Sequence, residues 1–145
     1  MLKLFAVIAT LWLAVPCGTP PGTVVRSFAP VGVYAGHWGV DYSMEVGSPV
    51  AAVSGGVVTF AGPIAVMESI TIDHGGGLRT SYSYLESIGV RVGNRVQRGD
   101  VIGTSGIDHG VAVLHFSARV NGRYVDPTFV FTCSGGVLRL SPLGP

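Results

Sequence analysis

The sequence predicts an all-β fold, a compact antiparallel β-sandwich or barrel, from three observations. The chain contains 22 glycines and nine prolines, and those after about Ser27 divide it into short segments. These segments are rich in valine, isoleucine, threonine and tyrosine, which favour strands. No segment has a helical period of apolar residues, and no linker separates one segment from the next. Strand-length units between glycine turns therefore indicate one compact β domain.

The expected strand segments follow one another at short intervals. They are PVAAV (49–53), GVVTFAG (56–62), SITIDHG (69–75), LRTSYSYL (78–85), a longer unit at 90–106 and a last unit at 111–127. Glycine turns separate the units, because glycine tolerates the backbone angles that tight turns need. We expect the β domain to cover residues 28–131 and the tail, residues 132–145, to lie at its periphery.

The overall composition fits this fold and excludes one class of function. A chain of 145 residues with 48% apolar and 12% charged residues has room for one domain with a proper core. The formal net charge is +1, and the arginines are scattered rather than clustered. Nucleic-acid binding requires a basic patch, so we expect no nucleic-acid partner. Nothing in the composition indicates an oligomeric state.

The first residues differ from the rest of the chain. Lys3 is followed by a largely apolar run, Leu4–Val15, and then by Pro16, Cys17 and the turn-rich GTPPG. This pattern is typical of an export signal, and the run is short for a membrane span. We therefore expect residues 1–22 to be an export signal or an N-terminal tether. The protein is expected outside the cytoplasm, in the cell envelope or the medium, with membrane contact only through that tether.

The two cysteines, Cys17 and Cys133, leave one question open. An exported protein with an even number of cysteines can form a disulfide. That pairing requires Cys17 to survive processing of the signal. The spacing does not match a cysteine-based zinc site.

The segment HWGVD contains the first candidate site residues. His37 and Asp41 lie four residues apart, in a chain with only four histidines. Such a pair either binds a metal ion or is simply part of a polar loop. Zinc binds readily to two imidazoles and one carboxylate and keeps a fourth position for water, which is the arrangement of a catalytic site. A third ligand is therefore needed.

Alternation along 111–120 places His115 as that candidate. With a period of two, Val113, His115 and Ser117 share one face, while Leu114 and Phe116 share the other. His115 thus faces away from the bulkiest apolar residues. It is either a solvated strand residue or a ligand above an open sheet face.

Taken together, these segments resemble the LytM/lysostaphin-type zinc metallopeptidases. The resemblance covers roughly residues 34–130, in the order HWGVD, GSPVAAVSGGVVTFAG, ITIDHGGGLRTSYSYL, VRVGNRVQRGDVIGTSG, LHFSARVNG and YVDP. It implies the family's β-sandwich fold with its duplicated hybrid motif, and one zinc ion held by His37, Asp41 and His115. Members of this family cut peptide cross-links in peptidoglycan, which the resemblance implies as substrate and partner.

Two positions depart from the family pattern. Tyr84 stands where the family usually has a histidine that helps hold the transition state. Val113 replaces the histidine that the resemblance would assign as general base. Positioned proton transfer contributes on the order of 10² to 10⁴-fold in rate, and a zinc ion still polarises a carbonyl without it. The resemblance therefore implies a zinc site with altered or weak catalysis.

Two further residues are candidates for the missing roles. The Tyr84 phenol can donate a hydrogen bond to a developing oxyanion, although packing on a tyrosine-rich strand is its plainer role. The loop at Asp108 and His109 is about one residue longer than the family's equivalent. His109 could bend over the metal as a surrogate base, or it could be a solvated loop residue. His74, at a strand end, is expected to be structural.

The sequence has two alternative interpretations that do not involve an enzyme. The first is a catalytically inactive domain that binds peptidoglycan or regulates other wall hydrolases. All three ligand positions remain in this chain, which favours the peptidase. The second is a lipoyl or biotinyl carrier, which VGNRVQRGDVIGTSG also resembles. Carriers need a lysine at a turn, and the only lysine is Lys3, within the export signal.

Overall fold

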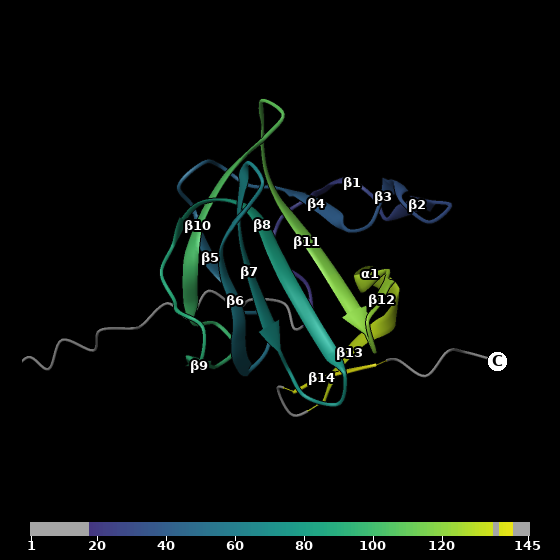
Figure 1. Ribbon diagram of the computed structural model, residues 1–145, viewed down its shortest axis with the longest axis vertical. Coiled ribbons are helices and arrows are strands. Elements are labelled where there is room, and N and C mark those ends of the chain that lie inside the picture. The colour runs from purple at the N-terminus through teal and green to yellow at the C-terminus, as the bar shows by residue number, and fades with distance from the viewer. Residues whose placement is uncertain (1–17, 135–136, 141–145) are drawn as a thin grey trace, which may run out of the picture.

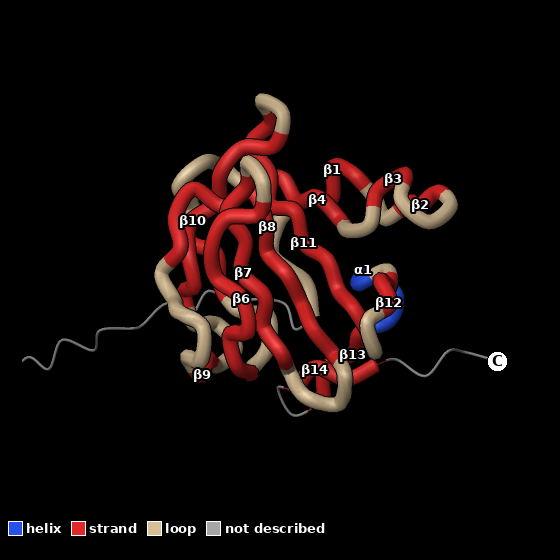
Figure 2. Tube along the Cα trace, viewed as in Figure 1, coloured by secondary structure: helices blue, strands red, loops and turns tan. Residues whose placement is uncertain are grey.

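The computed structural model describes residues 18–134 and 137–140, and its strands are antiparallel throughout (Figures 1 and 2). Residues 1–17, which include most of the predicted export segment and Cys17, lie outside the described residues, so the question of a Cys17–Cys133 disulfide stays open. The elements are β1 (Val24–Arg26), β2 (Ala29–Val31), β3 (Ala35–His37), β4 (Val40–Ser43), β5 (Pro49–Ala51), β6 (Gly56–Ile64), β7 (Met67–Asp73), β8 (Leu78–Ile88), β9 (Arg95–Val96), β10 (Val101–Asp108), β11 (Val111–Val120), β12 (Arg123–Val125), α1 (Pro127–Val130), β13 (Phe131–Ser134) and β14 (Val137–Leu140).

Ten of the strands form one sheet, with the order β1-β4-β11-β10-β8-β7-β6-β9 and with β12 and β5 added on β11 and β10. Two separate hairpins, β2–β3 and β13–β14, complete the described part of the fold. The all-β antiparallel prediction is confirmed. Among the described residues no helix is long and apolar enough to cross a membrane.

Strand β11 organises the sheet because it changes partners along its length. Its first residues pair with β10, its last residues pair with β8 and β12, and Val113–Phe116 also pair with β4. Strand β10 likewise pairs with β11, β8 and β5 in turn. Strands that switch partners let a sheet bend around its own core. The β10–β11 hairpin projects from the body, as does the β2–β3 hairpin (Figure 1).

One face of β11 forms the core and the other carries polar side chains, as the alternation predicts. Leu114 and Phe116 are fully buried, and Phe116 packs against the rings of Tyr82 and Tyr42. The Val53 amide donates a hydrogen bond of 2.9 Å to the Tyr82 hydroxyl oxygen, which fixes the position of this ring in the core. His115 lies on the opposite face, away from this core.

Candidate metal centre

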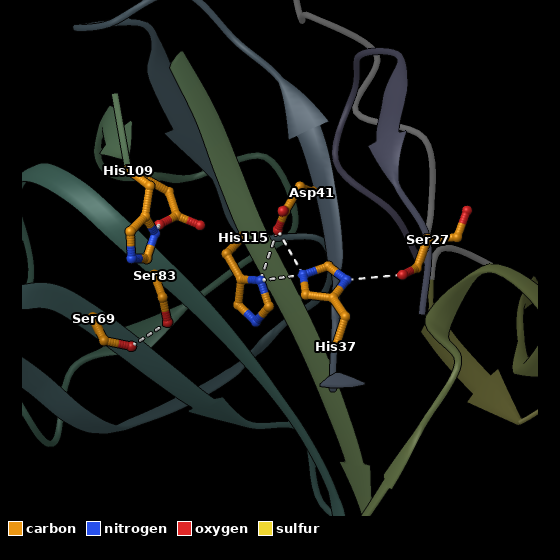
Figure 3. Close-up of polar contacts among 8 residues, drawn as sticks. Ser27, His37, Asp41, Ser69, Ser83, His109 and His115 are labelled. Atoms are coloured by element: carbon orange, nitrogen blue, oxygen red, sulfur yellow. Dashed lines mark hydrogen bonds and ion pairs between the residues drawn. The ribbon is translucent and has the colours of Figure 1, made fainter. Parts of the chain in front are cut away.

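The candidate centre forms where β4 and β11 pair. Asp41 on β4 is the direct cross-strand partner of His115 on β11, so both side chains point to the same face of the sheet. His37, the last residue of β3, reaches the same point from the other side (Figure 3). The structure therefore brings together all three residues that the resemblance assigns as metal ligands.

The three potential ligand atoms form a tight triangle. His37 Nε2 lies 3.1 Å from Asp41 Oδ1 and 3.2 Å from His115 Nδ1. His115 Nδ1 lies 2.7 Å from Asp41 Oδ1. Atoms at these separations could share one metal ion.

A backbone carbonyl fixes the ring of His37. The Nδ1–H group of His37 donates a hydrogen bond of 2.8 Å to the carbonyl oxygen of Ser27 (Figure 3). This bond assigns the proton of the neutral ring to Nδ1 and leaves the Nε2 lone pair aimed at Asp41 and His115. A ligating histidine whose second nitrogen is held in this way is the usual arrangement at protein metal sites.

Glycine at position 39 is required by the approach of His115. A Cβ atom on Gly39 would lie 2.6 Å from two atoms of the His115 ring and 2.7 Å from the Phe116 carbonyl oxygen. Real Cβ atoms do not approach so closely, so any side chain here would displace the ring. The glycine in HWGVD therefore makes room for the third candidate ligand, a role that the sequence pattern alone did not reveal.

The electrostatics of the triangle favour a cation. Asp41 is only 4% exposed, and its burial by itself raises the pKa of its carboxyl group. The hydrogen bond and charge of His115, together with those of His37, outweigh burial and leave the pKa of Asp41 below its usual value. An ionised carboxylate and the His37 Nε2 lone pair thus face each other at 3.1 Å. Such an arrangement requires protons or a metal ion between the groups.

Val113 forms an apolar wall beside the triangle. It lies on the same face of β11 as His115 and is 3% exposed. Together with Asp41, Arg26, Asp108 and other residues it lines a hollow of about 320 Å³. No proton acceptor is present at this position, because the side chain is an isopropyl group.

Tyr84 lies at an irregular point of β8. Its φ angle is +61°, and the pairing of β8 with β7 shifts between Ser83 and Leu85. The centroid of its ring lies 6.3 Å from that of His115. Burial, followed by the charge of Asp108 and a hydrogen bond to it, raises the pKa of Tyr84, although Arg26 opposes this shift. The phenol therefore keeps its proton and can act as a donor.

His109 lies at the tip of the β10–β11 hairpin. His109 and Gly110 both have positive φ angles, of 48° and 83°, which is the backbone of a two-residue type I′ turn. Its Nδ1–H group donates to the carboxylate of Asp108, and its side chain is 88% exposed. Its ring centroid lies 6.3 Å from that of Tyr84. Both residues, with His37 and His115, line a second hollow of about 270 Å³.

The fourth histidine lies apart from this site. His74 Nδ1 bonds the Gly55 carbonyl oxygen at 2.8 Å, and Nε2 lies 2.7 Å from the Thr80 hydroxyl. Burial lowers the pKa of His74, which favours its neutral form. These two bonds tie the β7–β8 turn to the segment before β6.

Comparison with known proteins places the chain in a family. The profile of peptidase family M23 matches residues 35–127. An uncharacterized protein of Mycobacterium tuberculosis is 37% identical over 134 residues, which cover 86% of this chain and 53% of that protein. The chain thus spans about half the length of the first curated relatives it matches.

Two relatives whose names state a peptidase activity are also similar to this chain. The DD-carboxypeptidase/endopeptidase Mpg of Neisseria gonorrhoeae is 38% identical over 65% of this chain and 22% of its own length. The glycyl-glycine endopeptidase ALE-1 of Staphylococcus capitis is 40% identical over 63% of this chain and 27% of its own length.

Lysostaphin from Staphylococcus simulans matches the fold with a TM-score of 0.65 and 30% identity, over 74% of this chain and 48% of that one. A zinc-containing peptidase from Vibrio cholerae gives a TM-score of 0.66 and 28% identity, over 73% and 36% of the two chains. The resemblance read from the sequence is confirmed, and the chain belongs to peptidase family M23, with a fold of the LytM/lysostaphin type.

Proposed function

We propose that this chain is an exported, zinc-binding metalloendopeptidase-like domain that acts on the peptide cross-links of peptidoglycan, with altered or weak catalysis. The observation that carries the proposal is the convergence of His37, Asp41 and His115. The roles of Tyr84 and His109 in this proposal are secondary to that convergence.

The donor set and its spacing fit zinc. Zinc bonds to histidine nitrogen and carboxylate oxygen are about 2.0–2.2 Å long and tetrahedral, which separates neighbouring ligand atoms by roughly 3.3 Å. The three separations here, 2.7, 3.1 and 3.2 Å, are close to that value. Three protein ligands leave a fourth position, which is typical of catalytic rather than structural zinc sites.

Different residues of the chain would have different roles around this site. A bound zinc ion would supply a Lewis acid and an acidified water molecule. The Ser27 carbonyl keeps the His37 ring in one tautomer, and Gly39 leaves room for His115. Tyr84 would donate its phenolic proton in a hydrogen bond to the oxyanion that develops on the substrate carbonyl.

His109 is the proposed substitute for the missing base. Its Nδ1–H group is engaged by Asp108, which leaves Nε2 as the nitrogen with a free lone pair. A base oriented by a carboxylate in this way can accept a proton at a defined atom. The ring lines the same hollow as His37 and His115, so it lies beside the space that a substrate would occupy.

The substrate class is proposed from the relatives and the location from the sequence. Mpg is named as a DD-carboxypeptidase/endopeptidase and ALE-1 as a glycyl-glycine endopeptidase. These names support peptide bonds of the bacterial cell wall as targets. The signal-like residues 1–22 support export to the same place.

Two observations favour a second candidate function, a peptidoglycan-binding or hydrolase-regulating domain without catalysis. The wall at Val113 is aliphatic and buried, and His109 is mostly exposed at a hairpin tip. If His109 does not replace the base, the site binds metal and peptide without rapid turnover.

Metal analysis followed by digestion of purified peptidoglycan distinguishes the two candidates. The peptidase is expected to carry about one zinc ion per chain and to release soluble cross-link fragments that disappear when a chelator is added. Zinc without release of fragments, but with sedimentation of the protein on peptidoglycan, would instead identify the binding domain. A purified chain that holds no zinc would refute both forms of the proposal.

A further inference from the structure

The face of the sheet that carries the metal triangle continues as an ordered series of cross-strand rows. The first row is formed by direct partners on five strands, namely Arg26, Asp41, His115, Ser83 and Ser69. Ser83 and Ser69 are hydrogen-bonded through their hydroxyl groups at 2.9 Å (Figure 3). Direct partners point to the same face, so the site and these buried hydroxyls lie on one face of the sheet.

The next two rows follow at intervals of two residues along β11. The second row consists of Ser117, Ser81 and Thr71, whose side chains are short. The third row consists of Tyr124, Arg119, Arg79 and Asp73. From His115 to Arg119 the strand rises by roughly 13 Å, at about 3.3 Å per residue. Two arginines therefore lie on the face of the metal triangle, about four extended residues away.

The third row borders a preformed hollow. A space of about 330 Å³ is lined by Asp73, Gly77, Arg79, Arg119, Asn121 and Gly122. Two turns meet there, because the Asn121 amide donates a hydrogen bond of 2.9 Å to the Gly77 carbonyl. The Asn121 side chain occupies the space that a Cβ on Gly77 would need. The hollow is thus a built feature of two linked turns.

The charges in this hollow leave one cation without a counterion. Arg79 is paired with Asp73 at 3.2 Å. Asp73 also accepts a hydrogen bond of 2.8 Å from the Gly75 amide. No ion pair joins Arg119 to a carboxylate in the part of the chain that the structure describes. Two arginines against one aspartate give the hollow a net positive charge.

A continuous aromatic edge connects this hollow with the metal triangle. The guanidinium of Arg119 lies 5.6 Å from the centre of the Tyr124 ring, and that ring lies 5.7 Å from the ring of Trp38. Trp38 in turn lines the hollow that contains His37 and His115. Tyr124 is 43% exposed, so an extended peptide could pack along this edge.

We propose that the Arg119 hollow is a second subsite, which binds a free carboxylate of the substrate peptide about four residues from the bond held at the metal triangle. This inference rests on the proposed function for the identity of the substrate. It adds the requirement that the preferred peptide is acidic at a fixed distance from the cut. Guanidinium–carboxylate pairs are charge-assisted and can be bidentate, which makes Arg119 selective for a carboxylate over an amide.

The first test measures binding by the purified full chain. Two dye-labelled six-residue peptides, alanine except for one glutamate or one glutamine and amidated at the C-terminus, are titrated in a fluorescence anisotropy assay. We expect the glutamate peptide to bind about threefold to tenfold more tightly, an advantage that shrinks in high salt because the pair is exposed. Arg119→Gln should remove the advantage, and Arg119→Lys should keep part of it.

The matched control is Arg123→Gln. Arg123 lies on β12 beside Tyr124 and pairs with Val120, so its side chain points to the opposite face. This variant loses the same charge and should keep the full preference for glutamate. Equal preference in wild type and Arg119→Gln, equal loss in Arg123→Gln, or no binding of either peptide up to millimolar concentration would each overturn the subsite. Circular dichroism of each variant confirms folding.

The second test measures the spacing. Peptides that end in a metal-binding hydroxamate and carry a glutamate one to six residues away are titrated against the zinc-loaded chain. Affinity should peak at about four residues, because both ends then bind at once. A flat dependence on spacing would overturn the inference of one continuous site. Glutamate preference without zinc binding would refute the proposed function alone, whereas zinc-dependent cleavage without glutamate preference would refute the subsite alone.

Discussion

The two sides of the candidate centre differ in how firmly their side chains are held. On the ligand side, His37, Asp41 and His115 are linked to one another, and Ser27 fixes His37 from behind. On the hairpin side, His109 is 88% exposed and is held only through its neighbour Asp108. The difference teaches that the candidate ligands are held by contacts that the proposed proton carrier does not share. A substitution on one side therefore need not disturb the other side.

The largest expected effect comes from removing a ligand. His115→Ala should reduce bound zinc from about one ion per chain to nearly none, since two remaining ligands hold a divalent ion poorly. Metal analysis after dialysis measures the content. His109→Ala, which is also a loss of one imidazole, should keep its zinc. Equal zinc content in wild type and His115→Ala would show that His115 is not a ligand and would contradict the difference between the two sides.

The next effect tests the hairpin side directly. If His109 is the surrogate base, His109→Ala should lower the cleavage of peptidoglycan cross-links by roughly 10² to 10⁴-fold, with zinc content and folding unchanged. The rate of release of cross-link fragments is the measurement. Unaltered turnover would show that His109 is a solvated hairpin residue and takes no part in proton transfer.

A smaller effect is expected at the glycine beneath the third ligand. Gly39→Ala should weaken zinc binding by roughly 10 to 100-fold, because the new Cβ displaces the His115 ring. Competition with a chromophoric chelator reports the affinity. Gly55→Ala is the control, because a Cβ there meets its nearest atom at an ordinary 3.5 Å. If both variants bind zinc like the wild type, the close approach at Gly39 is not a constraint.

Restoring a base at position 113 should raise the rate of cleavage, whereas the substitutions above lower zinc binding or cleavage. Val113→His should raise cleavage by at least about tenfold, a fraction of the range for positioned proton transfer. Val111→His places the same ring on the same face of β11 but one step farther from His115, and should leave the rate unchanged. A zinc-loaded Val113→His variant that gains no activity, beside a wild type that only binds peptidoglycan, would favour the binding domain.

The smallest effect is expected at Tyr84. Tyr84→Phe removes one hydrogen-bond donor and keeps the ring, so turnover should fall by about fivefold, which corresponds to roughly 1 kcal/mol. Zinc content should stay the same. A rate equal to that of the wild type would leave Tyr84 with a packing role only.

The sequence predicted the long strands and the three residues that converge at the candidate centre better than the surroundings of the site. Glycine spacing and β-branched residues marked the strands from β5 to β12, and alternation placed His115 opposite Leu114 and Phe116. The short strands β1 to β4 carry too few residues for a period to be recognised. The pairing of β4 with β11 places Asp41 opposite His115, 74 residues farther along the chain, which no local pattern encodes.

The details around the ligands depend on backbone geometry that side-chain patterns do not show. The bulge at Tyr84, the type I′ turn at His109 and the close approach of Gly39 to His115 are set by how neighbouring strands align. The Ser27 carbonyl is a main-chain group, so the identity of residue 27 gives no sign of its role.

The hydrogen bond from His37 to Ser27 also bears on how short the chain can be made without losing the geometry of the candidate metal centre. The family match begins at residue 35, eight positions after the carbonyl that orients the first ligand. Strand β1, which pairs with β4 next to Asp41, likewise lies before the matched region. A shortened protein cut to the matched residues would keep all three ligands and lose the acceptor that aims one of them. The geometry of the candidate metal centre therefore depends on β1 and residue 27, which lie upstream of the residues that match the family.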